Sequence, residues 1–150
     1  MLVEFSQERE PMKINVVDGS NYFRGLLLLI RKDRKIAEPE VRLMERIGKA
    51  LGFGKEFYDN AIHDILENEY IEDAPPMFSS EELAVRFIKD GLSLSISDND
   101  FDPSEEEWLR MTAVKNGLGM DWFTEERRLA TTRRKPEDRL EVEDLTVEYS

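Results

Sequence analysis

Cysteine is absent from the 150-residue sequence, which excludes disulfide bonds and thiolate metal sites. Histidine occurs once, at His63, and Asn60 three positions earlier rules out the Glu-x-x-His motif of di-iron bundles. Glycine-rich phosphate loops and serine nucleophile elbows are missing as well. We therefore expect a protein that acts by binding and is not an enzyme. A lone histidine is more typical of a helix surface or a packing contact than of a general base.

Long hydrophobic runs are also missing. The longest apolar run, Leu26–Ile30, is far shorter than the roughly 20 residues that a membrane-spanning helix needs. The first eight residues lack the basic and long apolar regions of a signal peptide. We therefore expect a cytoplasmic protein without membrane insertion.

Basic side chains are in the minority, with 21 lysines and arginines against 33 aspartates and glutamates and a net charge of −12. Residues 127–150 are balanced in charge, so residues 1–126 carry the whole acidic excess. Nucleic acids and anionic membranes bind clustered positive charge, so we expect neither as the main partner. An acidic surface suits a protein partner or a divalent cation.

An internal repeat with an offset of 65 residues organises the chain. Asp33–Glu40 and Asp98–Glu105 share an aspartate, two polar residues, an apolar residue and a glutamate at the eighth position. The match continues without a gap to Gly52–Tyr58 and Gly117–Phe123. Two copies of helix, acidic loop, helix, glycine turn and helix predict an all-α bundle of two pseudo-symmetric three-helix repeats.

Apolar spacing and cap chemistry place the six expected helices. The first helix is expected to start at Ser20, as N-cap at the end of an Asp18-Gly19-Ser20 turn, and the fourth at Ser79, in a capping box with Glu82. The fifth is expected to start at Pro103, with Asp102 as its N-cap. The second, third and sixth are expected to start at Pro39, Lys55 and Asp121. Gly52 is expected to end the second helix. The third is expected to run to about Glu69 and to bury Phe57. Small residues around Gly91 are expected to allow another backbone to approach the fourth helix.

The predicted organisation is an N-terminal arm (1–19), a helical domain (20–126) with repeats at 20–69 and 79–126, and a charged tail (127–150). The linker between the repeats is expected around Asp73–Pro76. Leu145, Val147 and Tyr149 alternate with polar residues, which is typical of a short strand. Such a strand would pair with the N-terminal arm or with a second chain in a homodimer; a disordered tail is the alternative.

The second acidic loop is a candidate site for Ca²⁺ or Mg²⁺, since these cations take oxygen ligands. Its candidate ligands are Asp98, Asp100, Asp102 and Glu105. Asp33 and Glu40 form a weaker candidate set, because basic residues crowd that loop. An EF-hand is excluded, because Pro103 and Leu109 stand where its glycine and its last acid belong. The alternative is structural, with the acids capping the helices that follow.

This pattern resembles the TerB family of tellurite-resistance-associated proteins, whose motif is commonly Asp-Gly-Glu-Ile followed by Glu and occurs twice in a compact helical fold. The matching residues are Asp33, Ile36 and Glu40 in the first copy and Asp98, Phe101 and Glu105 in the second. Arg34 and Asn99 stand where the family has glycine, and the resemblance covers about residues 20–126. It implies a bacterial cytoplasmic domain linked to stress or the cell envelope, sometimes discussed as metal-binding, with no established enzyme activity.

Two hypotheses follow from the sequence. In the first, the chain is a TerB-like acidic interaction module that docks a protein partner, with a divalent cation tuning the second loop. In the alternative, it is a metal-dependent hydrolase or a metal-sequestering protein that uses the loop carboxylates as ligands.

Overall fold

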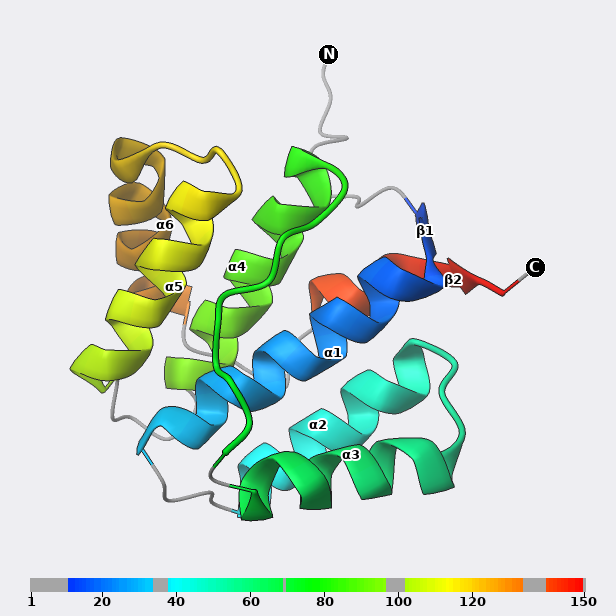
Figure 1. The fold of residues 1–150 in the computed structure, drawn as a ribbon. Coiled ribbons are helices and arrows are strands. Elements are labelled where there is room, and N and C mark those ends of the chain that lie inside the picture. Colours follow the sequence, from blue (N-terminus) through cyan, green and yellow to red (C-terminus); the bar gives the residue numbers. More distant parts are fainter. Residues whose placement is uncertain (1–10, 34–37, 69, 97–101, 134–139, 150) are drawn as a thin grey trace.

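The computed structural model describes residues 11–33, 38–68, 70–96, 102–133 and 140–149, and it confirms the all-α class (Figure 1). The helices in these ranges are α1 (Val16–Ile30), α2 (Glu38–Ala50), α3 (Lys55–Glu67), α4 (Glu81–Ile96), α5 (Pro103–Lys115) and α6 (Met120–Arg133). Short 3-10 helices are η2 (Arg31–Asp33) and η3 (Glu141–Asp144), and the strands are β1 (Met12–Asn15) and β2 (Leu145–Glu148).

The helices confirm the predicted repeat. The starts of α1, α2 and α3 at Val16, Glu38 and Lys55 recur 65 residues later as the starts of α4, α5 and α6. The central helices α1 and α4 each bury ten residues. The hairpins α2–α3 and α5–α6 lie on opposite sides of this central pair (Figure 1).

Close packing between the two repeats depends on small residues. The ring of Tyr22 on α1 meets the ring of Phe87 on α4 edge-on, with centroids 5.3 Å apart. A Cβ atom on Gly25 would lie 2.8 Å from that Phe87 ring, so only glycine fits there without a shift. A Cβ atom on Gly91 would lie 2.7 Å from the Leu109 side chain of the same repeat and 3.2 Å from the Leu29 side chain of α1, so side chains rather than a backbone approach this glycine.

The start of α1 differs from the prediction, because Asp18-Gly19-Ser20 is helical and not a turn. Asn15 is the N-cap, and its side chain accepts a hydrogen bond from the Asp18 N–H at 2.7 Å. The glycine has a tertiary reason: a Cβ atom on Gly19 would lie 2.9 Å from Cγ2 of Val147.

The start of α4 also differs by one residue. Ser80, not Ser79, accepts the hydrogen bond from the Leu83 N–H at 3.2 Å, so the Ser79–Glu82 capping box is wrong. Ser79 instead donates its hydroxyl to the buried Asp18 carboxylate, which ties the linker to α1.

Chain ends that are distant in sequence lie side by side. Strands β1 and β2 pair in parallel, with Met12 opposite Leu145 and Asn15 opposite Glu148, which confirms the predicted pairing with the N-terminal arm. The segment Leu140–Glu148 also contributes to the core. Its buried apolar side chains are Leu140, Val142, Leu145 and Val147. Within the described ranges, no helix combines the length and apolar character that crossing a membrane requires.

Candidate functional site

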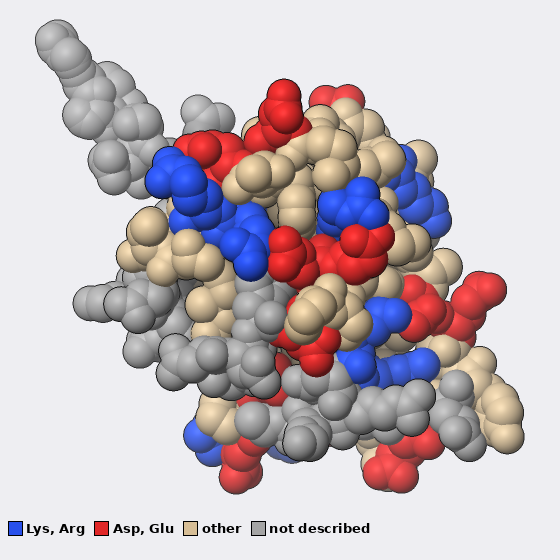
Figure 2. All heavy atoms as spheres, turned by 90° about the vertical axis from the view of Figure 1, so that its left-hand side faces the viewer, with Lys and Arg blue, Asp and Glu red and all other residues tan. Residues whose placement is uncertain are grey.

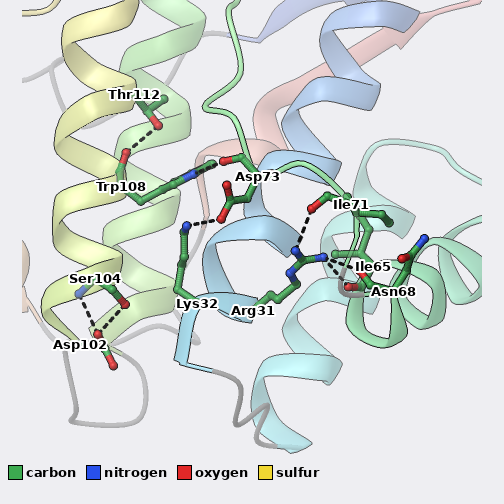
Figure 3. Close-up of polar contacts among 10 residues, drawn as sticks. All are labelled: Arg31, Lys32, Ile65, Asn68, Ile71, Asp73, Asp102, Ser104, Trp108 and Thr112. Carbon is green, nitrogen blue, oxygen red and sulfur yellow. Dashed lines mark hydrogen bonds and ion pairs between the residues drawn. The ribbon is translucent and has the colours of Figure 1, made fainter.

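The second acidic loop is described in part, because Asp98 and Asp100 lie outside the described residues. Asp102 is the N-cap of α5, as predicted: its carboxylate accepts hydrogen bonds from the N–H and hydroxyl of Ser104, both at 2.7 Å (Figure 3). These bonds lower the pKa of the Asp102 carboxyl. Glu105 is the third residue of α5 and only 1% exposed. The observed geometry of Asp102 is that of a helix cap.

The first acidic loop repeats this placement, since Glu40 is the third residue of α2 and is also 1% exposed. The Asp33 side chain lies outside the described part of the chain, as do Ile36 and Phe101 of the family-like motif. Over the described residues, no group of three or more histidine and carboxylate side chains is placed to hold a metal ion.

The two described basic residues at the first loop, Arg31 and Lys32, have structural partners. Arg31 donates from Nη1 to the carbonyls of Ile65 and Asn68, both at 3.0 Å, and from Nη2 to the carbonyl of Ile71 at 2.9 Å (Figure 3). Its guanidinium therefore caps the C-terminal end of α3, where carbonyls lack helical partners. Lys32 forms an ion pair with Asp73, which lowers the pKa of that carboxyl.

The linker between the repeats is fixed across α5. Trp108 donates its indole N–H to the Asp73 carbonyl at 2.7 Å, and Lys115 donates to the Pro75 carbonyl at 2.7 Å. An open groove of about 510 Å³ lies beside these contacts, with Trp108 and Met111 among its lining residues. Two of its three lining acids are engaged in ion pairs, Asp73 with Lys32 and Glu107 with Arg110.

Acidic and basic side chains are interleaved on the side of the molecule formed by α5 and α6 (Figure 2). Besides Glu107–Arg110 on α5, ion pairs here join Glu106 on α5 with Arg127 at 2.8 Å and Glu125 with Arg128 at 2.6 Å. Helix α6 has three acids and three arginines in its sequence. The acidic excess of the protein is therefore not concentrated on this helix.

Helix α3, the counterpart of α6 in the first repeat, has four acids and one lysine. Its lysine pairs with Asp59 at 2.5 Å, whereas Glu56, Asp64 and Glu67 are exposed and form no ion pair with a described residue. Phe57, expected in the core, is 50% exposed among them. Its ring meets the ring of Phe53 edge-on, with centroids 5.0 Å apart. In the sequence, this surface can be recognised by comparing charges: α3 has a clear excess of acids, whereas its repeat counterpart α6 is balanced.

A shallow pocket of about 440 Å³ lies at the C-terminal end of α3. Its lining residues are His63, Asp64, Glu67, Asn68, Tyr70 and Ile71. Tyr70 is 88% exposed, and its backbone N–H donates to the Asn68 side chain at 2.9 Å, which holds the chain turn beside the helix. Carboxylates beside an exposed aromatic ring are suited to binding a cationic group. The His63 side chain is on the helix surface, one of the two positions expected for it.

A second polar cluster, fully inside the protein, was not anticipated from sequence. Asp90 of α4 accepts the hydroxyl hydrogen of Tyr22 at 2.8 Å and the N–H groups of Glu141 and Val142 at 2.7 and 2.9 Å. Desolvation raises the pKa of Asp90 to about 7, although these three hydrogen bonds act in the opposite direction. The same burial raises the pKa of Tyr22 well above its ordinary value.

Comparison of the chain with protein-family models, with curated proteins and with solved structures gives no match.

Proposed function

We propose that the protein is a non-catalytic acidic interaction module that binds a basic protein segment along the outward face of α3 and in the pocket at its end. One observation carries this proposal: the exposed acids of α3 form no ion pairs with described residues, whereas Glu125 on α6 pairs with a neighbouring arginine. Such carboxylates can accept ion pairs and hydrogen bonds from a partner without breaking existing ones.

The arrangement of α3 fits a partner that lies along the helix. Glu56, Asn60, His63 and Glu67 recur at spacings of three and four residues, which places them on one face. Exposed Phe57 adds apolar area near the start of this face and Tyr70 lies beyond its end, so the surface is not purely electrostatic. Aromatic residues next to charged ones supply much of the binding energy of many protein interfaces.

The chemistry of the pocket favours arginine on the partner. A guanidinium donates in pairs to a carboxylate such as Asp64 or Glu67 and stacks on an aromatic face such as that of Tyr70. The net charge of −12 attracts a basic segment from a distance, and salt screens that attraction.

The role in a stress or envelope pathway, in the cytoplasm of a bacterium, is part of the same proposal and depends on the resemblance to the TerB family. The paired three-helix repeats support it, since the resemblance implies a motif that occurs twice in a compact helical fold. The cation and hydrolase hypotheses have less support, because the described carboxylate of Asp102 is engaged as a helix cap.

Isothermal titration calorimetry with a short arginine-rich peptide, at low and at moderate salt concentration, tests the proposal. The double variant Asp64→Asn/Glu67→Gln should weaken binding by about tenfold, because it removes two pocket carboxylates that form no ion pair with a described residue. Raising the salt concentration should weaken peptide binding to the wild-type protein, and it should reduce the difference in affinity between the wild-type protein and the double variant.

The control is the double variant Glu125→Gln/Glu126→Gln on α6, which changes the net charge by the same amount. Its affinity for the peptide should be within about twofold of the wild-type affinity, because only the small change in net charge affects binding. Equal weakening by both double variants would show that the peptide senses only total charge, and the proposed site would be rejected.

A further inference from the structure

The linker between the two repeats is held by an asparagine at the end of α5. Asn116 is the C-cap of α5 and is 9% exposed. Its side-chain Nδ2 donates to the carbonyls of Pro76 and Thr112, both at 2.9 Å. Its Oδ1 accepts the N–H of Phe78 at 2.8 Å. The three bonds use both the donors and the acceptor of the amide, so a carboxylate at this position could not reproduce them.

The first repeat has a different residue at this position. Leu51, the counterpart of Asn116 at the 65-residue offset, is an apolar core residue that is 1% exposed. The helix end therefore does not require an asparagine. What Asn116 adds is the attachment of the linker, whose Phe78 ring packs in the core against Tyr22 and Phe87, with centroids 5.9 and 5.1 Å away.

Gly117 follows Asn116, and the sequence contains no other asparagine–glycine pair. In such a pair the glycine nitrogen attacks Cγ of the asparagine side chain, because glycine has no Cβ atom to hinder the approach. The N–Cγ bond forms, the glycine nitrogen loses its proton, and the Cγ–Nδ2 bond breaks to release ammonia. Water then opens the five-membered imide to aspartate or isoaspartate. The reaction consumes one water, releases one ammonia and needs no oxidant or reductant.

The native conformation opposes this reaction. Ring closure requires the Gly117 nitrogen to eclipse Cβ of Asn116, whereas at ψ 11° it nearly eclipses the backbone nitrogen of Asn116. The Gly117 N–H also donates to the Val114 carbonyl at 3.0 Å. The linker fixes the side-chain amide itself. Ring closure therefore requires the linker to leave Asn116 and the end of α5 to open.

We propose that Asn116 is a deamidation site gated by the linker, protected while residues 76–78 are docked and converted when they are released. The product prevents the linker from docking again. An aspartate at this position has no donor for the carbonyls of Pro76 and Thr112 and places a negative charge against them. Isoaspartate also inserts a methylene group into the backbone before Gly117. The reaction thus makes a transient opening of the linker permanent.

Mass spectrometry of the 150-residue chain tests the protection. The protein is incubated at neutral pH with and without guanidinium chloride, and conversion of Asn116 is followed by peptide mapping. The folded protein should react more slowly than the unfolded one by about a hundredfold or more, because only its open fraction reacts. Equal rates in the two conditions would overturn the proposal.

A linker variant tests the gate. Lys115 donates to the Pro75 carbonyl at 2.7 Å, and the Ser79 hydroxyl donates to Asp18, so these contacts flank residues 76–78. The double variant Lys115→Met/Ser79→Ala should lose protection by about tenfold, each rate being divided by the rate of the same variant in guanidinium chloride. Each single variant should show a smaller loss in the same direction.

The control is Gly52→Ser, which destabilises the first repeat at a left-handed position, φ +82°, and leaves the linker contacts in place. Urea denaturation gives the global stability of each variant. The double variant should lose more protection than Gly52→Ser at equal global stability. If protection follows global stability alone, whole-domain unfolding controls the reaction and the proposed gate is rejected.

The variant Asn116→Asp reproduces the aspartate product and tests its effect. Hydrogen exchange of the Phe78 amide should be at least about tenfold faster in this variant than in the wild-type protein, because the linker no longer docks. The amide of Leu29 in α1 should change less. Unchanged protection at Phe78 would contradict the lasting release of the linker.

Discussion

Gly52 and Gly117, 65 residues apart, end the second helix of each repeat with almost the same backbone, φ +82° and +84°. This conformation is left-handed, and any residue with a Cβ atom adopts it at a cost of about 1–2 kcal/mol. The duplication is therefore preserved in backbone conformation as well as in helix boundaries.

Replacing either glycine by serine should lower the free energy of unfolding by about 1 kcal/mol or more. At Gly117 the new Cβ atom would also lie 3.1 Å from the Glu81 carboxylate, so that variant should be the less stable of the two. Urea denaturation measures both. The matched control is Gly54→Ser, where φ is −68° and no atom lies within 4 Å of the new Cβ. It should be neutral or stabilising, because serine is a good N-cap.

Arg31 is expected to stabilise the folded protein by capping the C-terminal end of α3. Arg31→Met should lower the free energy of unfolding by about 2 kcal/mol, because the carbonyls of Ile65 and Asn68 at the end of α3, and of Ile71 beyond it, lose a charged donor. Lysine should restore only part of the loss, since one ammonium group cannot reproduce the planar fork. Chemical denaturation provides the values.

The control for Arg31 is Arg42→Met. Arg42 is exposed and approaches Glu38 only at 4.0 Å, so its loss should change the free energy of unfolding by less than about 0.5 kcal/mol. Similar losses for both arginines would contradict the capping role.

Substitutions of Asp102 distinguish between two roles of the second acidic loop, helix capping and cation binding. Asp102→Ala should lower the thermal midpoint, whereas Asp102→Asn should keep it, because asparagine is an equally good N-cap. The hydrogen bonds from Ser104 lower the pKa of Asp102, so its contribution should be complete above its ordinary pKa of 3.8 and fade as the pH falls below it. Scanning calorimetry with and without Mg²⁺ and Ca²⁺ checks this. A cation-induced rise of the midpoint that disappears in Asp102→Asn would support the cation site instead.

Local chemistry made part of the fold predictable. Asp102 and Pro103 are adjacent in sequence and define the start of α5 by themselves, and Gly52 ends α2 in the same way. The 65-residue offset then extends these local signals to the second repeat, as the helix starts confirm.

The failures concern residues whose partners are distant in sequence. Gly19 resembled a turn glycine, but its neighbour is Val147, which belongs to the last strand. No prediction singled out Asp90, whose donors lie 68 residues before and about 50 residues after it. Phe57 fits the apolar spacing of α3, yet the helix turns it half outward, which no local pattern reveals. The candidate site on α3 was missed because exposure cannot be read from spacing.

The most direct measurement of the proposed binding role is an NMR titration of the isotope-labelled 150-residue chain with an arginine-rich peptide. Our proposal predicts that the largest chemical-shift changes fall on residues 56–71, with Asp64, Glu67 and Tyr70 among them, and that α6 changes little. Changes concentrated on α5 and α6, or spread evenly over all acidic residues, would contradict it.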